Sequence, residues 1–66
     1  MSYSIEFEQE SDGRWIAEIP SLPGVMVYGA NKEEATFKVE ALALRVIASK
    51  IERERTTTDD VQFAVA

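Results

Sequence analysis

Hydrophobic and polar residues alternate along the first part of the chain, from residue 3 to residue 11. Three hydrophobic side chains share one face of an extended segment: Tyr3, Ile5 and Phe7. Three acidic side chains share the other face: Glu6, Glu8 and Glu10. A period of two residues is typical of a β-strand that is buried on one side and solvated on the other. The pattern therefore predicts a first strand within residues 3–11.

A second alternating segment covers residues 14–19, immediately after Asp12 and Gly13. Asp-Gly is a strong hairpin signal, because both residue types tolerate the positive φ that a tight turn requires. The sequence predicts a second strand that pairs antiparallel with the first. Its inward face carries Trp15, which we expect to anchor the core or an interface, because aromatic side chains bury large areas.

The next ten residues, Pro-Ser-Leu-Pro-Gly-Val-Met-Val-Tyr-Gly, hold both prolines of the chain. Proline lacks an N–H group and fits poorly inside a sheet, so Pro20 is expected to end the second strand. Pro23 and Gly24 indicate a turn. Residues 25–28 then resume as a third strand, which Gly29 ends. We interpret the two prolines as a rigid bend between strands, or as part of a strand at the sheet edge.

The longest periodic segment predicts a helix from about Lys32 to about Arg53. Asn31 is a suitable N-cap, and Glu34 follows three residues later as a capping-box partner. Residues 56–60 read as a loop, and residues 61–66 alternate again as a last strand. The expected fold is α+β with the order βββαβ, one helix packed on the sheet, and a single domain over residues 1–66.

The predicted helix carries two hydrophobic stripes on opposite sides. The first can cover the sheet: Ala35, Val39, Leu42, Ala43 and Val46. The second alternates spacings of four and three residues, as in a coiled-coil contact: Phe37, Ala41, Leu44, Ala48 and Ile51. One small sheet covers only one stripe, so the second predicts a homo-oligomer, either a dimer or a tetramer. The alternative is that loops of the same chain cover it.

Composition restricts the chemistry of the chain. It has 66 residues, no Cys and no His, which removes disulfides, thiolate metal sites and the commonest general base. We therefore expect no metal, no cofactor and no enzymatic activity. The net charge of −5 disfavours nucleic-acid binding and favours a basic protein partner. No targeting segment or membrane-length hydrophobic run is present, so a cytoplasmic location is expected.

Twelve residues between positions 12 and 35 form a distinctive combination of glycines, prolines, hydrophobic residues and glutamates: Asp12, Gly13, Trp15, Ala17, Pro20, Leu22, Pro23, Gly24, Gly29, Glu33, Glu34 and Ala35. In this combination the chain resembles the HicB-like antitoxin family over about residues 3–50. The resemblance implies a partial ribonuclease H-like fold, in which three antiparallel strands precede a helix and a fourth strand lies parallel beside the first.

The same resemblance implies a function. HicB-like proteins are non-enzymatic antitoxins of type II toxin–antitoxin systems, and they bind and occlude a small basic mRNA-cleaving toxin of the HicA type. Candidate toxin contacts are the strand-face glutamates Glu6, Glu8 and Glu10. Many members carry a C-terminal DNA-binding segment, but this chain stops after its last strand, so direct DNA binding is not expected.

Two other functions compete with this interpretation. One is a solitary homo-oligomeric binding module with a different partner. The other is a metal-dependent, ribonuclease H-like nuclease that uses the strand-face glutamates with Asp59 and Asp60. Alternating glutamates on a strand are far more often a solvated surface than a catalytic site, and shared fold is weak evidence for activity.

Overall fold

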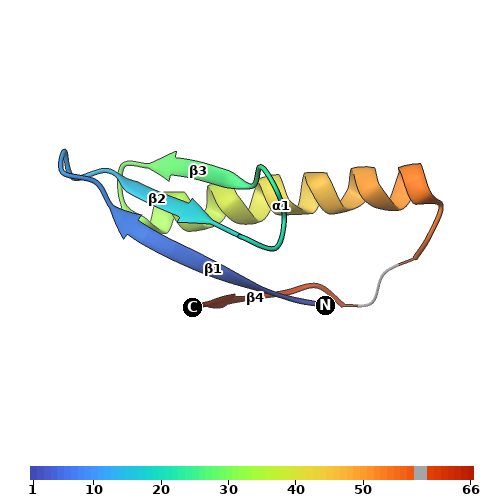
Figure 1. Cartoon of the computed structure of the whole chain (residues 1–66). Helices are drawn as coiled ribbons and strands as arrows, with labels where there is room; N and C mark the ends of the chain where they lie inside the picture. Colours follow the sequence, from blue (N-terminus) through green and yellow to red (C-terminus); the bar gives the residue numbers. More distant parts are fainter. Residues whose placement is uncertain (58–59) are drawn as a thin grey trace.

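In the computed structural model the chain forms a four-stranded mixed sheet with one long helix on one face (Figure 1). The structure describes residues 1–57 and 60–66. The elements are β1 (Ser2–Gln9), β2 (Trp15–Glu18), β3 (Met26–Gly29), α1 (Lys32–Glu54) and β4 (Gln62–Val65). The strand order is β3-β2-β1-β4, and β4 runs parallel to β1 while the other neighbours are antiparallel. The predicted α+β class and βββαβ order are confirmed.

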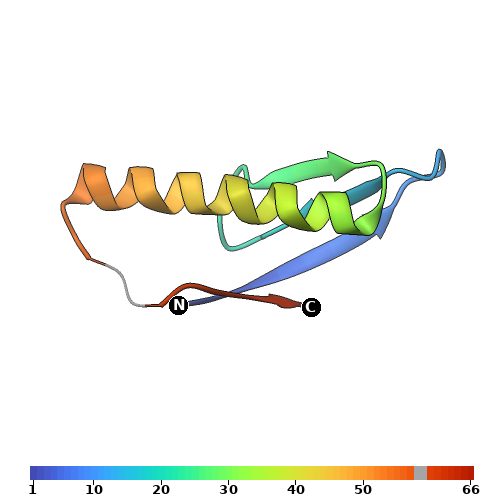
Figure 2. The same cartoon turned by 180° about the vertical axis from the view of Figure 1, so that it is seen from behind.

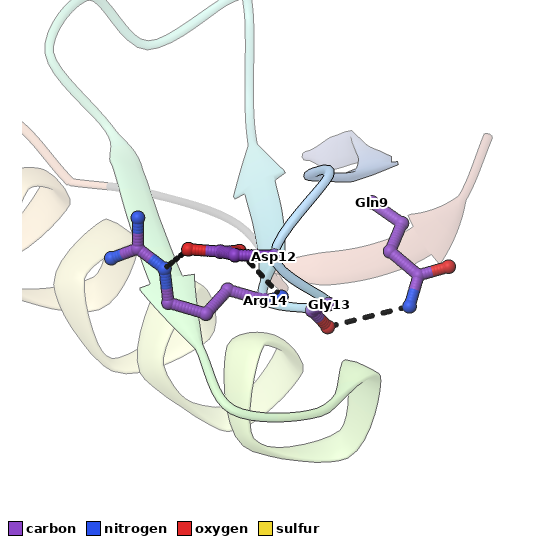
Figure 3. A network of polar contacts seen from close by, with 4 residues as sticks. All are labelled: Gln9, Asp12, Gly13 and Arg14. Carbon is purple, nitrogen blue, oxygen red and sulfur yellow. Dashed lines mark hydrogen bonds and ion pairs between the residues drawn. The ribbon is translucent and has the colours of Figure 1, made fainter.

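The turn that joins β1 to β2 is held by main-chain hydrogen bonds and by side-chain contacts, and Figure 3 shows the side-chain contacts. The amide of Glu10 donates to the carbonyl of Arg14 at 2.7 Å, and the amide of Gly13 donates to the carbonyl of Glu10 at 2.9 Å. Asp12 accepts from the Arg14 amide at 3.0 Å and pairs with the Arg14 Nε at 2.8 Å. Gly13 has φ +93°, which explains glycine at this position.

Two consecutive β-turns connect β2 to β3. The Leu22 amide donates to the Ile19 carbonyl at 2.9 Å, and the Val25 amide donates to the Leu22 carbonyl at 3.0 Å. Leu22 therefore ends the first turn and begins the second, and its side chain is buried in the core. The Ile19 amide closes the connection by donating to the Val25 carbonyl at 3.0 Å.

Each proline occupies the second position of one of these turns. Pro20 follows Ile19, and Pro23 follows Leu22, where the fixed φ of proline suits the turn. Gly24 takes the third position of the second turn with φ +83°, as a type II turn requires. The prolines are three residues apart because the two turns share Leu22. The predicted rigid bend is confirmed, and neither proline interrupts a strand.

A capping network fixes the start of α1. The Asn31 Oδ1 accepts from the Glu34 amide at 2.7 Å, and the Glu34 carboxylate accepts from the Ala30 amide at 3.0 Å. Lys38 pairs with Glu34 at 3.2 Å and donates to the Tyr28 carbonyl at 3.4 Å, so the network also ties the helix to β3. The predicted N-cap at Asn31 is confirmed, whereas the predicted capping-box partner Glu34 accepts from the Ala30 amide instead of the Asn31 amide.

The core consists of nine small or medium-sized hydrophobic residues: Ile5, Ala17, Ile19, Leu22, Val25, Ala35, Val39, Ala43 and Ile47. The first helix stripe faces it as predicted, although Ile47 belongs to that stripe and was not included, while Leu42 and Val46 are only half-buried. None of the six aromatic side chains is fully buried. The chain therefore keeps its largest hydrophobic groups at or near the surface.

The helix packs on β2 and β3 and continues past their ends, while β1 and β4 lie to one side of it (Figures 1 and 2). The radius of gyration is 12.5 Å, whereas a compact chain of this length has a value of about 11 Å. The molecule measures 42 × 18 × 16 Å and is therefore elongated along α1. In the part of the chain that the structure describes, no helix is both long and hydrophobic enough to cross a membrane.

Candidate protein-binding face

The face of the sheet opposite α1 carries no covering element among the described residues (Figure 1). Six side chains point to this face where β1, β2 and β3 pair with one another, because alternate residues of a strand point to opposite sides. We call them the outer sheet face. Strand register arranges them in two rows: Glu6, Glu18 and Met26 in one, and Glu8, Ile16 and Tyr28 in the other.

Two like charges lie directly opposite each other on this face. Glu6 and Glu18 are register partners on the antiparallel strands β1 and β2, and both are exposed. Within residues 1–57 and 60–66, neither carboxylate forms an ion pair. Like charges at directly opposed positions destabilise a sheet. The fold therefore retains an electrostatic cost that a cationic partner would remove.

The part of the outer sheet face that β2 and β3 contribute also carries hydrophobic side chains. Ile16 is half-buried, and the exposed Tyr28 lies beside it on β3. The Arg14 guanidinium lies 4.8 Å from the centre of the Tyr28 ring and pairs with Asp12. The Arg14 amide and side chain also lower the pKa of Asp12 below its usual 3.8. Because Asp12 already engages Arg14, that cation does not neutralise the glutamates of the face.

Of the three glutamates predicted as partner contacts, the structure places two on this face. Glu6 and Glu8 lie on β1, but Glu10 follows the end of the strand and sits half-buried in the hairpin turn. Glu18 completes the face and was missed. The signal was present in the sequence, because a hairpin centred on Asp12 sets Glu18 opposite Glu6.

The second helix stripe lies largely at the surface. The Phe37 side chain is 61% exposed and the Leu44 side chain is 49% exposed. Ala41 and Ala48 are exposed as well, whereas Ile51 is half-buried and packs against the core. Loops of the same chain therefore leave four of the five stripe residues uncovered. The homo-oligomer inferred from this stripe stays a prediction.

The remaining motif residues build the fold. Trp15 is half-buried, and the Lys32 ammonium lies 5.6 Å from the centre of its ring and 4.8 Å from the centre of the Phe7 ring. The Leu22 side chain extends from the double turn into the core. Gly29 is buried and contacts Ala35, which belongs to the first turn of α1. The motif thus positions β1, β2 and β3, the three strands that present the outer sheet face.

The structure describes all but one of the carboxylates proposed for a nuclease: Glu6, Glu8, Glu10 and Asp60. Among the residues that the structure describes, no three carboxylates lie close enough to hold a metal ion. Asp60 is exposed, and its carbonyl accepts from the Met1 ammonium. Asp59 lies outside the described residues, as does part of the predicted loop.

A small cleft lies between the C-terminal half of α1 and the start of β1. Its volume is about 200 Å³, and its lining includes Tyr3, Leu22 and Ile51. Pockets for small molecules usually measure about 300–1,000 Å³ and combine hydrophobic walls with a few converging polar groups. A second depression, beside Pro23 and Arg53, has a volume of about 440 Å³, within that range, but it is more open to solvent. Neither has the character of an enclosed cofactor site.

The chain is similar in sequence to a known protein of comparable length. It is 27% identical over 63 residues to the UPF0150 protein Ta0767 of Thermoplasma acidophilum, a match that covers 94% of this chain and 91% of that protein. No family model and no solved structure matches. The match extends over almost the entire chain and so includes both the sheet and the helix. This chain is therefore similar, over nearly its whole length, to a UPF0150 protein.

Proposed function

We propose that this chain is an antitoxin-like interaction protein, without enzymatic activity of its own, that binds a small basic protein and covers its functional surface. The observation that carries the proposal is the set of exposed carboxylates on the outer sheet face: Glu6, Glu8 and Glu18. The net charge of −5 acts in the same direction at longer range, because it attracts a cationic partner.

The chemical class of the partner follows from the resemblance to HicB-like antitoxins. That resemblance implies an mRNA-cleaving toxin of the HicA type. An enzyme that cleaves RNA must bind phosphates, and its substrate surface is therefore rich in Lys and Arg. Carboxylates on a rigid sheet can occupy the positions of those phosphates. Binding of this kind blocks the substrate without any chemistry at the antitoxin.

Electrostatic attraction alone gives fast association but modest affinity. The hydrophobic half of the outer sheet face supplies what is missing, because Ile16 and Tyr28 offer an area that a partner can bury. A basic partner with one hydrophobic group among its cations would fit the two rows. Affinity should fall as salt concentration rises, since exposed charges are screened.

The test uses the purified chain and a small basic, HicA-type protein, chosen first from the genes that neighbour the gene of this chain. Titration calorimetry measures binding, and cleavage of a single-stranded RNA measures inhibition. The Glu6→Lys/Glu18→Lys variant should bind at least about tenfold more weakly, because it inverts two charges at the centre of the contact. Glu52→Lys/Glu54→Lys makes the same charge change at the exposed C-terminal end of α1 and serves as the control.

Equal weakening by both variants would reduce the interaction to non-specific attraction and would remove the outer sheet face from the proposal. If no small basic protein is encoded nearby and none binds, the solitary binding module becomes the better explanation. The RNA assay repeated with the chain alone and Mg²⁺ or Mn²⁺ tests the nuclease alternative. Cleavage that Glu8→Gln abolishes would establish it.

A further inference from the structure

On the side of α1 that faces away from the core, opposite charges stand at the two ends of a hydrophobic stripe. Hydrophobic residues of the second stripe run from Phe37 to Ile51. Glu33 lies in the first turn of α1, four residues before Phe37. Arg55 is the C-cap that directly follows the helix, four residues after Ile51, and its backbone is left-handed. The hydrophobic stripe is thus preceded by an acidic residue and followed by a basic one, with Leu44 at its centre.

We propose that two copies of this chain pair through α1 in antiparallel orientation, about a two-fold axis at Leu44, with Glu33 of each copy beside Arg55 of the other. In such a pair, residues equally far before and after Leu44 meet across the interface. Leu44 meets its own copy, and Phe37 meets Ile51. This interface is independent of the outer sheet face, because α1 lies on the opposite side of the sheet.

The charges select the antiparallel orientation. Glu33 and Arg55 are both exposed, and neither forms an ion pair within the described part of the chain. An antiparallel pair brings them together twice, once at each end. A parallel pair would oppose glutamate to glutamate and arginine to arginine. The macrodipoles of the two helices also favour the antiparallel arrangement.

The small residues of the stripe allow close approach. Ala41 and Ala48 flank Leu44 with spacings of three and four residues, and both are exposed. Two helices with such a seam can pack with their axes about 8 Å apart, near the lower end of the usual range. The larger side chains of the stripe, Phe37 and Leu44, then lose much of their 61% and 49% exposure.

The surface of the single chain is larger than that of a typical compact monomer. Its accessible area is 4607 Å², whereas a monomer of 7.4 kDa typically exposes about 4,200 Å². A standard interface removes about 800 Å² per partner. The occupant is a second copy rather than a different protein because the stripe and its flanking charges complement themselves at three mirrored positions: Leu44 with Leu44, Phe37 with Ile51, and Glu33 with Arg55.

The first experiment is sedimentation equilibrium of the full chain without any partner. The expected mass is twice 7.4 kDa. Leu44→Glu places two carboxylates face to face at the axis and should weaken the dimer about a hundredfold. Met26→Glu is the matched control, because Met26 on β3 is 48% exposed but lies away from the stripe. A monomeric wild type, or a dimer that only Met26→Glu disrupts, overturns the proposal.

The second experiment tests the orientation and does not depend on Leu44. Glu33→Arg and Arg55→Glu should each weaken the dimer about tenfold, because each creates two repulsive contacts. The double variant should return to within about threefold of the wild type, since both ion pairs form again with reversed sign. Insensitivity to all three changes would indicate a parallel or unrelated interface and would overturn the proposal. Circular dichroism confirms that each variant remains folded.

This result can be separated from the proposed function. The dimer is measured on the chain alone, and Glu6→Lys/Glu18→Lys should leave its mass unchanged. A dimer without a basic partner would support the helix pairing and count against the antitoxin-like role. A basic partner bound to a monomer would support the antitoxin-like role and count against the helix pairing.

Discussion

Gly29 lies so close to Ala35 that a side chain at residue 29 has no room. A Cβ built on Gly29 would stand 2.5 Å from the Ala35 amide nitrogen and 2.8 Å from its Cα. Both residues are buried, so the end of β3 and the first turn of α1 meet backbone to backbone. The hydrogen bond from the Ala30 amide to the Glu34 carboxylate lies at the same junction.

Gly29→Ala should destabilise the chain by about 3 kcal/mol, because the colliding atoms are main-chain atoms that cannot rotate away. Urea unfolding followed by circular dichroism measures the loss. Gly13→Ala is the control: a Cβ there meets nothing within 4 Å, and only its φ of +93° is unfavourable. The control should cost about 1 kcal/mol. Equal losses at the two positions would show that the contact with Ala35 is not the limiting feature.

Leu22 is the residue on which the double turn depends, since it belongs to both turns and its side chain fills the core. Leu22→Ala should cost about 3 kcal/mol through the cavity that it leaves. Pro23→Ala should cost only about 0.5–1 kcal/mol, because proline acts mainly by restricting the unfolded chain. The two free energies of unfolding come from the same urea titrations. A larger loss at Pro23 would mean that turn rigidity, rather than core filling, holds β2 and β3 in place.

Much of this architecture follows from local signals in the sequence. The Asp12-Gly13 hairpin, the Asn31 cap and the period-two strands each depend on residues close together in the chain, and each was predicted correctly. Glu18 shows how a local signal can be overlooked, because its place opposite Glu6 required only the hairpin register. The double turn is also local, and its prolines predicted a bend. The pattern of prolines did not predict that both turns share Leu22.

Other features depend on how far the helix reaches across the sheet. Ile51 fits the second stripe by its spacing, yet it is half-buried because it lines the cleft beside Tyr3 and Leu22. Ile47, by contrast, follows Ala43 by four residues, so helical spacing alone places it on the first stripe. Helical periodicity gives the direction of each side chain but not the position of the helix over the strands. That position is set by tertiary packing against β2 and β3, which a residue pattern does not specify.

The pH dependence of stability should reveal the cap of α1. The Ala30 amide, and after it the Lys38 ammonium, lower the pKa of Glu34 below its usual 4.5. A lowered pKa in the folded state means that the contribution is complete above about pH 4.5 and is lost as the pH falls through the lower folded value. Glu34→Gln keeps an acceptor for the Ala30 amide but carries no charge, so the variant should lack this part of the acid sensitivity.

Thermal unfolding of both proteins between about pH 6 and pH 2.5 measures the difference. The gap between wild type and Glu34→Gln should narrow as the pH falls. Asp12→Asn is the comparison, because the pKa of Asp12 is lowered from 3.8 and its contribution therefore stays complete down to about pH 3.8. A gap that is constant with pH would show that the Glu34 contact works through hydrogen bonding alone.

The outer sheet face should show a trade-off between stability and binding. Glu18→Gln removes the like charge opposite Glu6 and should stabilise the chain by about 0.5 kcal/mol. It should also weaken binding of a basic partner, because one of the exposed carboxylates is gone. Glu8→Gln makes the same charge change directly opposite Ile16 rather than directly opposite another carboxylate. This control should weaken binding to a similar degree without the gain in stability.

The two variants separate repulsion within the sheet from attraction to a partner. Urea unfolding at low salt gives the stability of each, and the same measurement at about 1 M salt should abolish the gain at Glu18→Gln, since screening removes the repulsion. If Glu18→Gln stabilises the chain and leaves binding intact, the Glu6–Glu18 repulsion only destabilises the sheet and has no role in binding. If both glutamines reduce affinity and only Glu18→Gln raises stability, the chain retains the repulsion because a partner relieves it.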